Sequence, residues 1–323
     1  MIKYIIRHIT QGSGMTTDKW GVLYCPKYRT GSRHKYWERI RKTLCDNGVD
    51  FDFVQSESEG SVVRLINMMI NNGYRTIVIV GGDSALNDAV NCLMAVEKDV
   101  RDAVALGVIP NGVMNDFARY WGIKEGDVEN VVSWMKKRRV REIDLGCIRY
   151  TDNMGGKRSR YFLNCVNIGF IANVMNLRER TRRFFGSRTL SMLFSLLLLV
   201  FQRLEYKMSL KINSDVIRRK IMTVCIGNAS GYGQTPSAVP YNGLLDVSVV
   251  HHPGVTQVLE GFYYLMSGAF LNHKSVHPYR TREVVVEEAR HALVSIDGRL
   301  IRKPVGSYKV SVEQEVINFI IPD

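Results

Sequence analysis

The sequence predicts an α/β plus β fold class, with an N-terminal doubly wound α/β domain and a C-terminal β-sandwich-like domain. Up to about residue 141, apolar strand-like runs alternate with segments of helical periodicity, as in a parallel sheet covered by helices. From residue 142 onward, short strand-like segments follow one another with turns between them. A glycine-rich turn joins a buried strand to a helix within residues 77–94, which is the architecture of a phosphate site.

The composition indicates a globular protein with an anionic partner. Of the 323 residues, 46% are hydrophobic and 23% are charged, which is enough apolar material to bury a core. The formal net charge of +13 favours a nucleotide, a nucleic acid or an acidic membrane surface, without choosing among them. The six cysteines lack zinc-binding spacing, and the N-terminus has no apolar run long enough for a signal peptide. We therefore expect a cytoplasmic protein with free thiols. No function is assigned to residues 1–18.

The elements of the N-terminal domain are expected in a regular order. Because loops at the carboxyl ends of parallel strands form the ligand crevice, the loops at 26–32, 81–85 and 110–116 should meet in space. Ser56 or Ser58 is a candidate N-cap for the second helix. Strands are predicted at 21–25, 50–55, 77–80 and 105–110, and helices at about 36–46, 56–71, 84–94 and from 117 onward.

The glycine-rich turn at Gly81 and Gly82 has two interpretations. The free N–H groups and the positive end of the dipole at the helix start favour an anion, so the turn could hold a phosphate. The alternative is an ordinary turn in which Asp83 caps the helix, and Asp116 could likewise cap the helix that starts at Phe117. The stretch matches neither GxGxxG nor GxxxxGK[ST], so neither of those motifs supports the phosphate interpretation.

The C-terminal part is predicted to be rich in strands, with one helical interruption. Arginines within 178–188 precede an apolar run at 190–201, which is shorter than the roughly 20 residues that cross a bilayer. We predict a buried helix with basic flanks, and the alternative is an element that faces a membrane and attracts anionic head groups. Strands are predicted at 143–148, 161–166, 208–212, 222–226, 244–250, 283–286, 293–296, 308–312 and 316–321.

Several motifs agree in order and spacing with one known family. Gly81 to Cys92 resembles the signature GGDGTLNEVVNG, and Pro110 to Arg119 resembles a proline-x-GTGNDFAR loop. Further matches are Cys25 to Gly31, Ser56 to Val62, Arg141 to Gly146, Phe162 to Phe170, Pro236 to Val247 and Ile296 to Gly298. From about Gly21 to the C-terminus, the chain therefore resembles the diacylglycerol kinase catalytic-domain family, in particular its bacterial soluble lipid kinases and the related sphingosine kinases.

The resemblance implies a nucleotide site and a lipid site. It implies ATP-dependent phosphorylation of a hydroxyl of diacylglycerol, a sphingoid base or a similar lipid at a membrane surface. Residues 1–141 would form the nucleotide-binding domain, with 314–323 returning to it, and 142–313 the lipid-substrate domain. The nucleotide-binding residues carried over from the family are Pro26, Thr30, Ser56, Gly81, Gly82, Asp83, Ser84, Gly112, Asn115 and Asp116.

The resemblance also implies the catalytic roles. Asp83 would act on Mg²⁺ through a water, and Asp116 would support the same metal site. Asp297 would be the general base that takes the hydroxyl proton, as phosphoryl transfer requires a carboxylate near the attacking oxygen. Asp297–Gly298 is also a strong hairpin signal, and Asp144 is interpreted as a structural carboxylate where the domains join.

Three departures from the family motifs bear on activity. Ser84 replaces a glycine of the family motif at a position where the backbone would approach a phosphate closely. Met114 places a thioether in the loop that matches GTGN. Arg299 replaces the glutamate of the DGE motif, where it would favour ionised Asp297 and weaken it as a base, or would itself meet phosphate. Asn242 stands where the family's structural metal segment usually has an aspartate, so the resemblance does not extend to that metal.

Four functions follow from these observations. The first is an ATP-dependent lipid kinase, and its alternative is a catalytically weakened or inactive relative that binds nucleotide or lipid as a regulator. A kinase of NAD or another small molecule is a third option. A nucleic-acid binder ranks last because only charge supports it, so no nucleic-acid partner is expected. We expect a cytoplasmic protein with peripheral membrane association, and exposed sheet edges would allow a homodimer. The sequence does not name the lipid.

Overall fold

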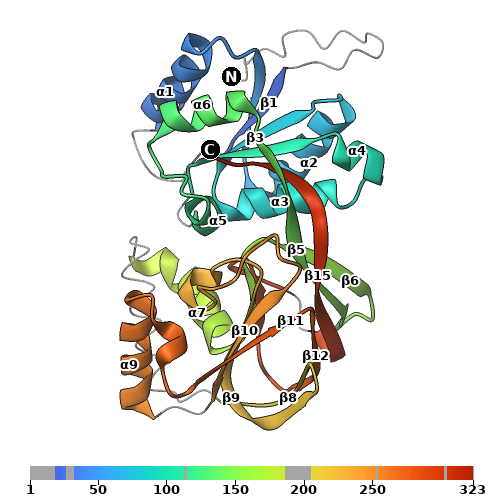
Figure 1. The fold of residues 1–323 in the computed structure, drawn as a ribbon, viewed down its shortest axis with the longest axis vertical. Coiled ribbons are helices and arrows are strands. Elements are labelled where there is room, and N and C mark those ends of the chain that lie inside the picture. The colour runs from blue at the N-terminus through green and yellow to red at the C-terminus, as the bar shows by residue number, and fades with distance from the viewer. Residues whose placement is uncertain are drawn as a thin grey trace.

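The computed structural model (Figure 1) has two lobes and describes residues 19–26, 33–112, 115–185, 205–251, 254–301 and 304–322. An N-terminal α/β lobe lies above a C-terminal lobe made mainly of strands, which confirms the predicted fold class. Two long antiparallel strands, β5 (Val140–Asp152) and β15 (Pro304–Ile320), run from one lobe into the other. No helix within these residue ranges is long and apolar enough to cross a membrane.

The N-terminal lobe is built on a parallel sheet with the strand order β2–β1–β3–β4. The end of β15 extends this sheet, since Asn318 and Phe319 pair in parallel with Ala105 and Leu106. Every residue of β3 and β4 is buried, as expected for parallel strands covered on both faces. The four strands are β1 (Trp20–Tyr24), β2 (Phe51–Gln55), β3 (Thr76–Gly81) and β4 (Ala105–Pro110).

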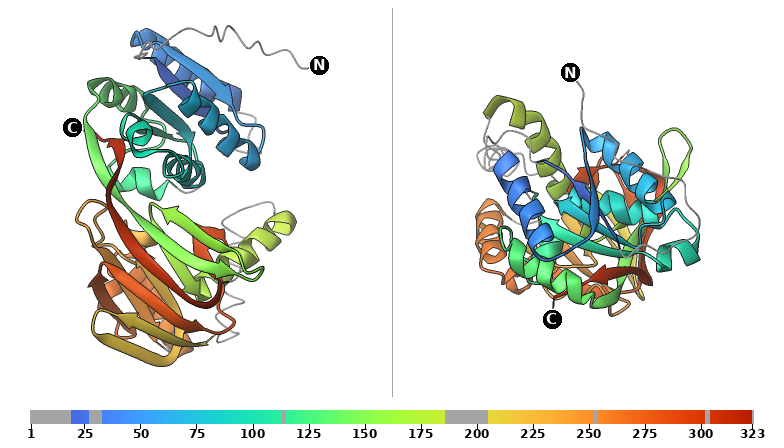
Figure 2. Two further views of the ribbon diagram at one scale, coloured as in Figure 1. Left: turned by 90° about the vertical axis from the view of Figure 1, so that its right-hand side faces the viewer. Right: turned by 90° about the horizontal axis from the view of Figure 1, so that it is seen from above.

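Helices cover both faces of this sheet (Figures 1 and 2). On one face α1 (Arg33–Asp46) packs against α6 (Val128–Lys137), and on the other α2 (Glu59–Asn71) packs against α3 (Asp83–Leu93). Two short helices, α4 (Lys98–Asp102) and α5 (Asp116–Tyr120), flank β4. Helix α6 was not predicted, although its buried residues Val128, Val131, Val132 and Met135 recur at helical spacing.

The C-terminal lobe is an antiparallel, sandwich-like set of strands around its own apolar core. Val166, Ile168, Val224 and Ile226 lie in that core because alternate residues of β7 and β9 face it. The remaining strands are β6 (Lys157–Phe162), β7 (Cys165–Gly169), β8 (Tyr206–Ile212), β9 (Asp215–Gly227), β10 (Leu245–His251), β11 (Val276–Thr281), β12 (Glu283–Ala289), β13 (Val294–Ile296) and β14 (Arg299–Leu300).

Helices α7 (Phe170–Phe185) and α9 (Val255–Met266) flank this lobe and share a small apolar cluster that contains Val174 and Val258. Two 3₁₀ turns, η1 (Gly231–Gly233) and η2 (Phe270–Asn272), complete the lobe. Strand β11 and helix α9 were not predicted. The predicted helix at 190–201 lies outside the described residues.

Three strand predictions for the C-terminal lobe were wrong in where the strands begin or end. The predicted strand at 161–166 is two strands, because the chain breaks between β6 and β7 at Leu163 and Asn164, whose N–H groups turn towards the Asp297 carboxylate. The predicted strands at 308–312 and 316–321 are one strand, β15. The pairing of β15 with β5 shifts register after Glu313, and Glu315 takes a left-handed φ of 51° there. An irregularity of this kind bends a strand without ending it.

The carboxylate of Asp144 holds this irregularity in place. The side chain is 1% exposed, and its two oxygens accept hydrogen bonds from the N–H groups of Gly243 (2.7 Å) and Glu315 (2.9 Å). The N–H of Asp144 donates to the carbonyl of Pro240 at 2.8 Å. Asp144 is therefore a structural carboxylate that ties β5 to β15 where these strands run between the lobes. The domain boundary between 141 and 142 stays a prediction.

We expect Asp144→Ala to lower the free energy of unfolding by about 2–4 kcal/mol, because two buried N–H groups lose their acceptor. Asp144→Asn is the matched control, since it keeps one acceptor oxygen and should lose less. Urea denaturation measures both variants. A loss below about 0.5 kcal/mol for the alanine variant, the size usual for surface changes, would contradict the role of this carboxylate.

Candidate functional site

The carboxyl ends of three parallel strands are joined by hydrogen bonds at one edge of the N-terminal sheet. The N–H of Cys25 donates to the carbonyl of Val80 at 2.8 Å, and the N–H of Asn111 donates to the carbonyl of Gly81 at 2.8 Å. The side-chain amide of Asn111 donates to the carbonyl of Cys25 at 3.1 Å. The expected meeting of the loops that follow β1, β3 and β4 is therefore confirmed for their described parts.

The glycine-rich turn touches the loop after β4 through backbone alone. A Cβ on Gly112 would lie 2.3 Å from the Cα of Gly82, so no other residue fits between these two loops. Asn115 holds the second loop closed, because its Oδ1 accepts from the N–H of Gly112 at 2.9 Å. Gly82 is the N-cap of α3, and Ser84 lies partly exposed in its first turn. The first N–H groups of a helix have no intrahelical acceptor, so this helix start is suited to an anion.

Asp83 links the two loops through its side chain. The residue is 4% exposed, and its carboxylate accepts hydrogen bonds from the N–H groups of Asp116 (2.9 Å) and Phe117 (3.2 Å) at the start of α5. Asp83 therefore does not cap its own helix, and that alternative interpretation is wrong. Asp116 does not cap α5 either, since the N-cap is Asn115 and the Asp116 carboxylate pairs with Arg119 at 2.7 Å.

The pKa of Asp83 is raised to about 7, mainly because burial disfavours the charged carboxylate. The hydrogen bond from the Asp116 N–H opposes this shift, while the negative charges of Asp116 and Asp297 add to it. Burial also raises the pKa of Asp116, against the lowering effect of Arg119. Asp297 belongs to the other lobe, but the Asn87 amide, one helical turn after Asp83 in α3, donates to its carboxylate at 2.8 Å.

Asp297 is both a hairpin residue and a buried carboxylate. With Gly298 it forms the two-residue turn between β13 and β14, where both residues have positive φ (44° and 79°). Its carboxylate is 3% exposed and accepts four hydrogen bonds. The donors are the N–H groups of Leu163 (2.9 Å), Asn164 (3.0 Å) and Cys165 (3.0 Å) and the Asn87 amide (2.8 Å). Burial raises the pKa of Asp297 despite these donors.

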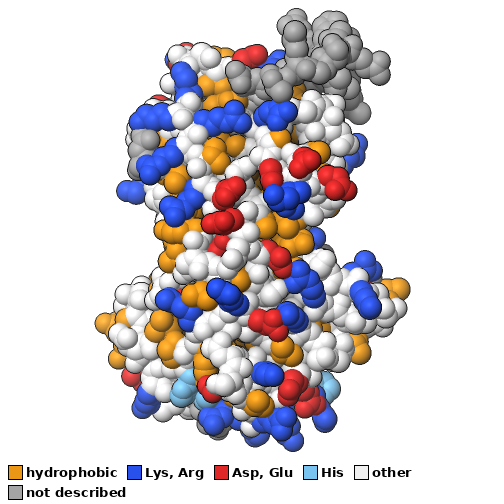
Figure 3. All heavy atoms as spheres, turned by 45° about the vertical axis from the view of Figure 1, so that its right-hand side comes forward, with side chains coloured by type: hydrophobic (Ala, Val, Ile, Leu, Met, Phe, Trp, Pro, Cys, Tyr) orange, Lys and Arg blue, Asp and Glu red, His pale blue; other side chains and the backbone are white. Residues whose placement is uncertain are grey.

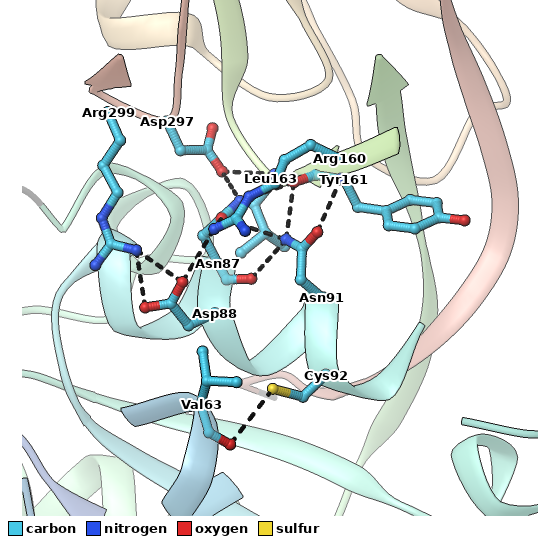
Figure 4. A network of polar contacts seen from close by, with 10 residues as sticks. All are labelled: Val63, Asn87, Asp88, Asn91, Cys92, Arg160, Tyr161, Leu163, Asp297 and Arg299. Atoms are coloured by element: carbon cyan, nitrogen blue, oxygen red, sulfur yellow. Dashed lines mark hydrogen bonds and ion pairs between the residues drawn. The ribbon is translucent and has the colours of Figure 1, made fainter. Parts of the chain in front are cut away.

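Helix α3 makes polar contacts with the C-terminal lobe (Figure 4). The amides of Asn87 and Asn91 donate to the carbonyl of Tyr161 at 2.9 and 3.0 Å, and the Oδ1 of Asn91 accepts from the N–H of Tyr161. These polar positions interrupt the buried apolar face of α3. Neither asparagine was predicted from the sequence as a site residue, and this interruption is the signal by which both could have been found.

The sequence left open whether Arg299 acts on Asp297 or meets phosphate, and the structure pairs it with another carboxylate. Its guanidinium pairs with Asp88 of α3, with N···O distances of 2.7 and 2.8 Å, and Arg160 pairs with the same carboxylate at 3.1 Å. Asp88 is 3% exposed, so its charge requires a partner, whereas Asp297 is already fully hydrogen-bonded. Asp88 and Arg160 are functional candidates that sequence reasoning missed.

The structure brings most of the predicted site residues together. Ser56 is buried at the end of β2, where its N–H donates to the carbonyl of Tyr24 at 2.9 Å, and Pro26 follows β1. Thr30 and Met114 lie outside the described residues. The residues at the loop edge of the N-terminal sheet are Pro26, Ser56, Gly81, Gly82, Asp83, Ser84, Gly112, Asn115 and Asp116, and Asp297 approaches from the other lobe.

The carboxylates could take part in holding Mg²⁺. Within the described part of the chain there is no group of three side chains able to form a metal site. Mg²⁺ is usually held by one or two carboxylates together with substrate phosphates and waters, so Asp83 and Asp116 fit this donor type. The assignment of these two residues to a metal stays a prediction.

Comparisons with known proteins agree with this architecture. The family model "Diacylglycerol kinase catalytic domain" matches residues 19–148, and "YegS C-terminal NAD kinase beta sandwich-like domain" matches residues 164–317. The Bacillus subtilis protein YtlR, described as a lipid kinase, is 29% identical over 150 residues, which is 46% of each chain. A Pseudomonas syringae protein described as a YegS-like lipid kinase is 28% identical over 271 residues, covering 81% of this chain and 82% of the relative.

Among solved structures, that of a Bacillus anthracis protein described as a diacylglycerol kinase superposes with a TM-score of 0.73. The superposition covers 95% of this chain and 99% of the Bacillus anthracis chain, and the two sequences are 18% identical. At this identity the likeness concerns the fold.

The raised pKa of Asp83 predicts a pH dependence for the metal-free protein. Between about pH 4, the pKa of an unfolded aspartate, and about pH 7, the folded state binds the proton more tightly. The stability contributed by this group is present at low pH and is lost as pH rises through about 7. We expect the melting temperature to fall between about pH 4 and 7, and Asp83→Asn to lose much of that dependence. Equal pH profiles for the two proteins would contradict the shift.

Proposed function

Because the chain belongs to the diacylglycerol kinase catalytic-domain family, we propose that it transfers the γ-phosphoryl group of ATP to a hydroxyl of a lipid. The acceptor class is diacylglycerol, a sphingoid base or a similar lipid. The observation that carries the proposal is the convergence of carboxylates from both lobes, Asp83 and Asp116 from one and Asp297 from the other, beside a helix start suited to phosphate.

The nucleotide side of this proposal rests on the loops after β1, β3 and β4. The N–H groups at the start of α3 would donate to the phosphates, and the contact between Gly82 and Gly112 keeps this backbone surface free of side chains. Ser84 is small and can donate a further hydrogen bond. Bound Mg²⁺ would neutralise charge on the phosphates, with Asp83 and Asp116 as its protein partners.

The acceptor side rests on Asp297. A general base must reach the proton that it removes, and its pKa should lie near the working pH. Burial moves the pKa of Asp297 upward, in the direction that strengthens it as a base. Three of its four hydrogen-bond donors are backbone groups of its own lobe, and the fourth, Asn87, belongs to the other lobe. Only the Asn87 bond therefore depends directly on how the lobes are placed.

A regulator without catalysis is the second candidate, and the same carboxylate favours it. Each oxygen of Asp297 already accepts two hydrogen bonds, which leaves no free position for a substrate hydroxyl while all four bonds are kept. Such a protein would bind nucleotide or lipid through the same loops without phosphoryl transfer. The two candidates differ in one measurable outcome, the labelling of a lipid by ATP.

We also propose that the protein is cytoplasmic and works at a membrane surface, where its acceptor resides. The net charge of +13 supports contact with anionic lipids. On the face drawn in Figure 3, lysine and arginine side chains are spread over both lobes and interspersed with acidic ones. A homodimer stays a prediction.

The test of the proposed function is phosphoryl transfer from labelled ATP to a total lipid extract in the presence of Mg²⁺. We expect the wild-type protein to label a lipid, whose mass names the acceptor. We expect Asp297→Asn to lower the rate by about 10²–10⁴-fold, the usual contribution of a general base.

The matched control for this test is Asp152→Asn, which alters a buried carboxylate of the β5–β6 hairpin, bonded to Arg158, and should keep the rate. Full activity of Asp297→Asn would contradict the base. ATP-induced stabilisation of the wild-type protein without any labelled lipid would favour the regulator.

Gly112→Ala tests the nucleotide site without relying on catalysis. Its new Cβ would meet the backbone of Gly82, so the loops must move apart. We expect the rise in melting temperature caused by Mg²⁺–ATP to be lost or strongly reduced. Gly254→Ala is the control, because a Cβ there meets nothing within 4 Å. An unchanged ATP-induced shift in Gly112→Ala would argue against this site.

A further inference from the structure

Tyr232 has an unusual backbone conformation in the turn η1. Its φ and ψ are 59° and 33°, in the left-handed region that bulky residues rarely adopt. The surrounding contacts hold the turn in this form. Thr235 Oγ1 donates to the carbonyl of Ala229 at 2.9 Å, and a Cβ on Gly231 would lie 2.4 Å from that same Oγ1. Residues held in such conformations cluster at functional sites, where the surrounding structure compensates for the strain.

The hydroxyl of Tyr232 lies beside the Asp297 turn. A Cβ on Gly298 would be 3.3 Å from the hydroxyl oxygen, and the charge of Asp297 acts on Tyr232 more strongly than those of Asp83 and Asp116. The hydroxyl is buried and has no hydrogen-bond partner among the described residues. Burial raises the pKa of Tyr232 well above its usual value, so the group is a neutral donor at physiological pH. An unpaired buried hydroxyl costs stability, and its retention calls for an explanation.

Two further unpaired polar atoms lie on the same side of the C-terminal lobe. Gln234, two residues after Tyr232, donates to the Oδ1 of Asn167 at 3.0 Å, while its own Oε1 has no partner in the described structure. Ser295 lies in β13, two residues before the turn residue Asp297, and pairs in register with Asn167. Its buried hydroxyl also lacks a described partner.

The strand register shows that these atoms belong to a polar sheet face. Ser295, Asn167, Cys225 and Ser248 stand opposite one another across β13, β7, β9 and β10, and all four are fully buried. The neighbouring residues along the strands point to the other face, into the apolar core. The hydroxyls at both ends of this row, Ser295 and Ser248, lack a partner in the described structure, and Ser295 is the one that lies near Asp297. A buried polar face of this kind suits a polar ligand better than an apolar one.

We propose that Tyr232 is an acceptor-binding residue, whose hydroxyl donates a hydrogen bond to the polar head of the lipid beside Asp297. Gln234 and Ser295 complete the same head-group subsite. The inference rests on the proposed function and names the part of the site that holds the acceptor. Tyr232 belongs to the lobe of Asp297, not to the loops that face the nucleotide, so its effect is expected on the acceptor alone.

Tyr232→Phe removes only the hydroxyl, and Tyr308→Phe is the matched control. Tyr308 is a second tyrosine whose buried hydroxyl has no described partner, but it lies in the sandwich core. The acceptor probes are diacylglycerol and a sphingoid base, each in mixed micelles. For whichever probe the wild-type protein phosphorylates, we expect Tyr232→Phe to raise the acceptor KM by about fivefold to tenfold, the effect of one lost hydrogen bond. The KM for ATP and the ATP-induced thermal shift should not change.

The same experiment separates acceptor binding from a structural role. Removing an unpaired buried hydroxyl should leave the melting temperature equal or higher, so a structural tyrosine would show no change in acceptor KM. Ser295→Ala tests the subsite a second time, with Ser248→Ala, at the far end of the polar row, as its control. Wild-type acceptor KM in both Tyr232→Phe and Ser295→Ala, or a change in the KM for ATP instead, would overturn the proposal.

If the wild-type protein labels neither probe nor any lipid of the extract, the proposed function fails and the subsite fails with it. If the wild-type protein labels a lipid and Tyr232→Phe matches it in every constant, the subsite alone fails. The two failures are therefore distinguishable.

Discussion

The buried carboxylate of Asp297 imposes a constraint on both lobes, because it must be hydrogen-bonded wherever it lies. A charge taken out of water is tolerated only when hydrogen bonds replace its hydration. Here three consecutive N–H groups, from Leu163 to Cys165, provide that replacement, and the chain between β6 and β7 turns to supply them. The fourth bond comes from Asn87 of α3, so the same carboxylate also contacts the N-terminal lobe.

The charge reversal at Arg299 is compensated within the structure. Its guanidinium meets the buried carboxylate of Asp88, which Arg160 also contacts, so both lobes contribute to one ion-pair cluster on α3. Losing both arginines would leave the buried Asp88 carboxylate without a charged partner, which is strongly destabilising. The arginine at the glutamate position of the DGE motif therefore takes part in the interface between the lobes. This substitution alone is not evidence that the site has lost activity.

Besides Asp297, two further buried carboxylates accept backbone N–H groups where separate segments meet. Asp83 binds the start of α5 to the glycine-rich turn, and Asp144 binds the irregularity of β15 to β5. In each case a short side chain satisfies donors that no regular strand or helix provides. The candidate site lies between the first of these carboxylates and Asp297, and its loops are thus held by hydrogen bonds as well as by packing.

The sequence by itself determined the class of the fold and the position of the phosphate-type turn, because apolar periodicity and glycine placement are local signals. Through the family resemblance, it also identified Asp83, Asp116 and Asp297 as candidates for one site. Only the tertiary structure decided what these groups contact. Asp83 accepts from the start of α5, and Arg299 pairs with Asp88. The predicted strand at 161–166 is interrupted where its N–H groups donate to the Asp297 carboxylate. The bond between Asn87 and Asp297 joins residues 210 positions apart, and no local pattern encodes a contact at that separation.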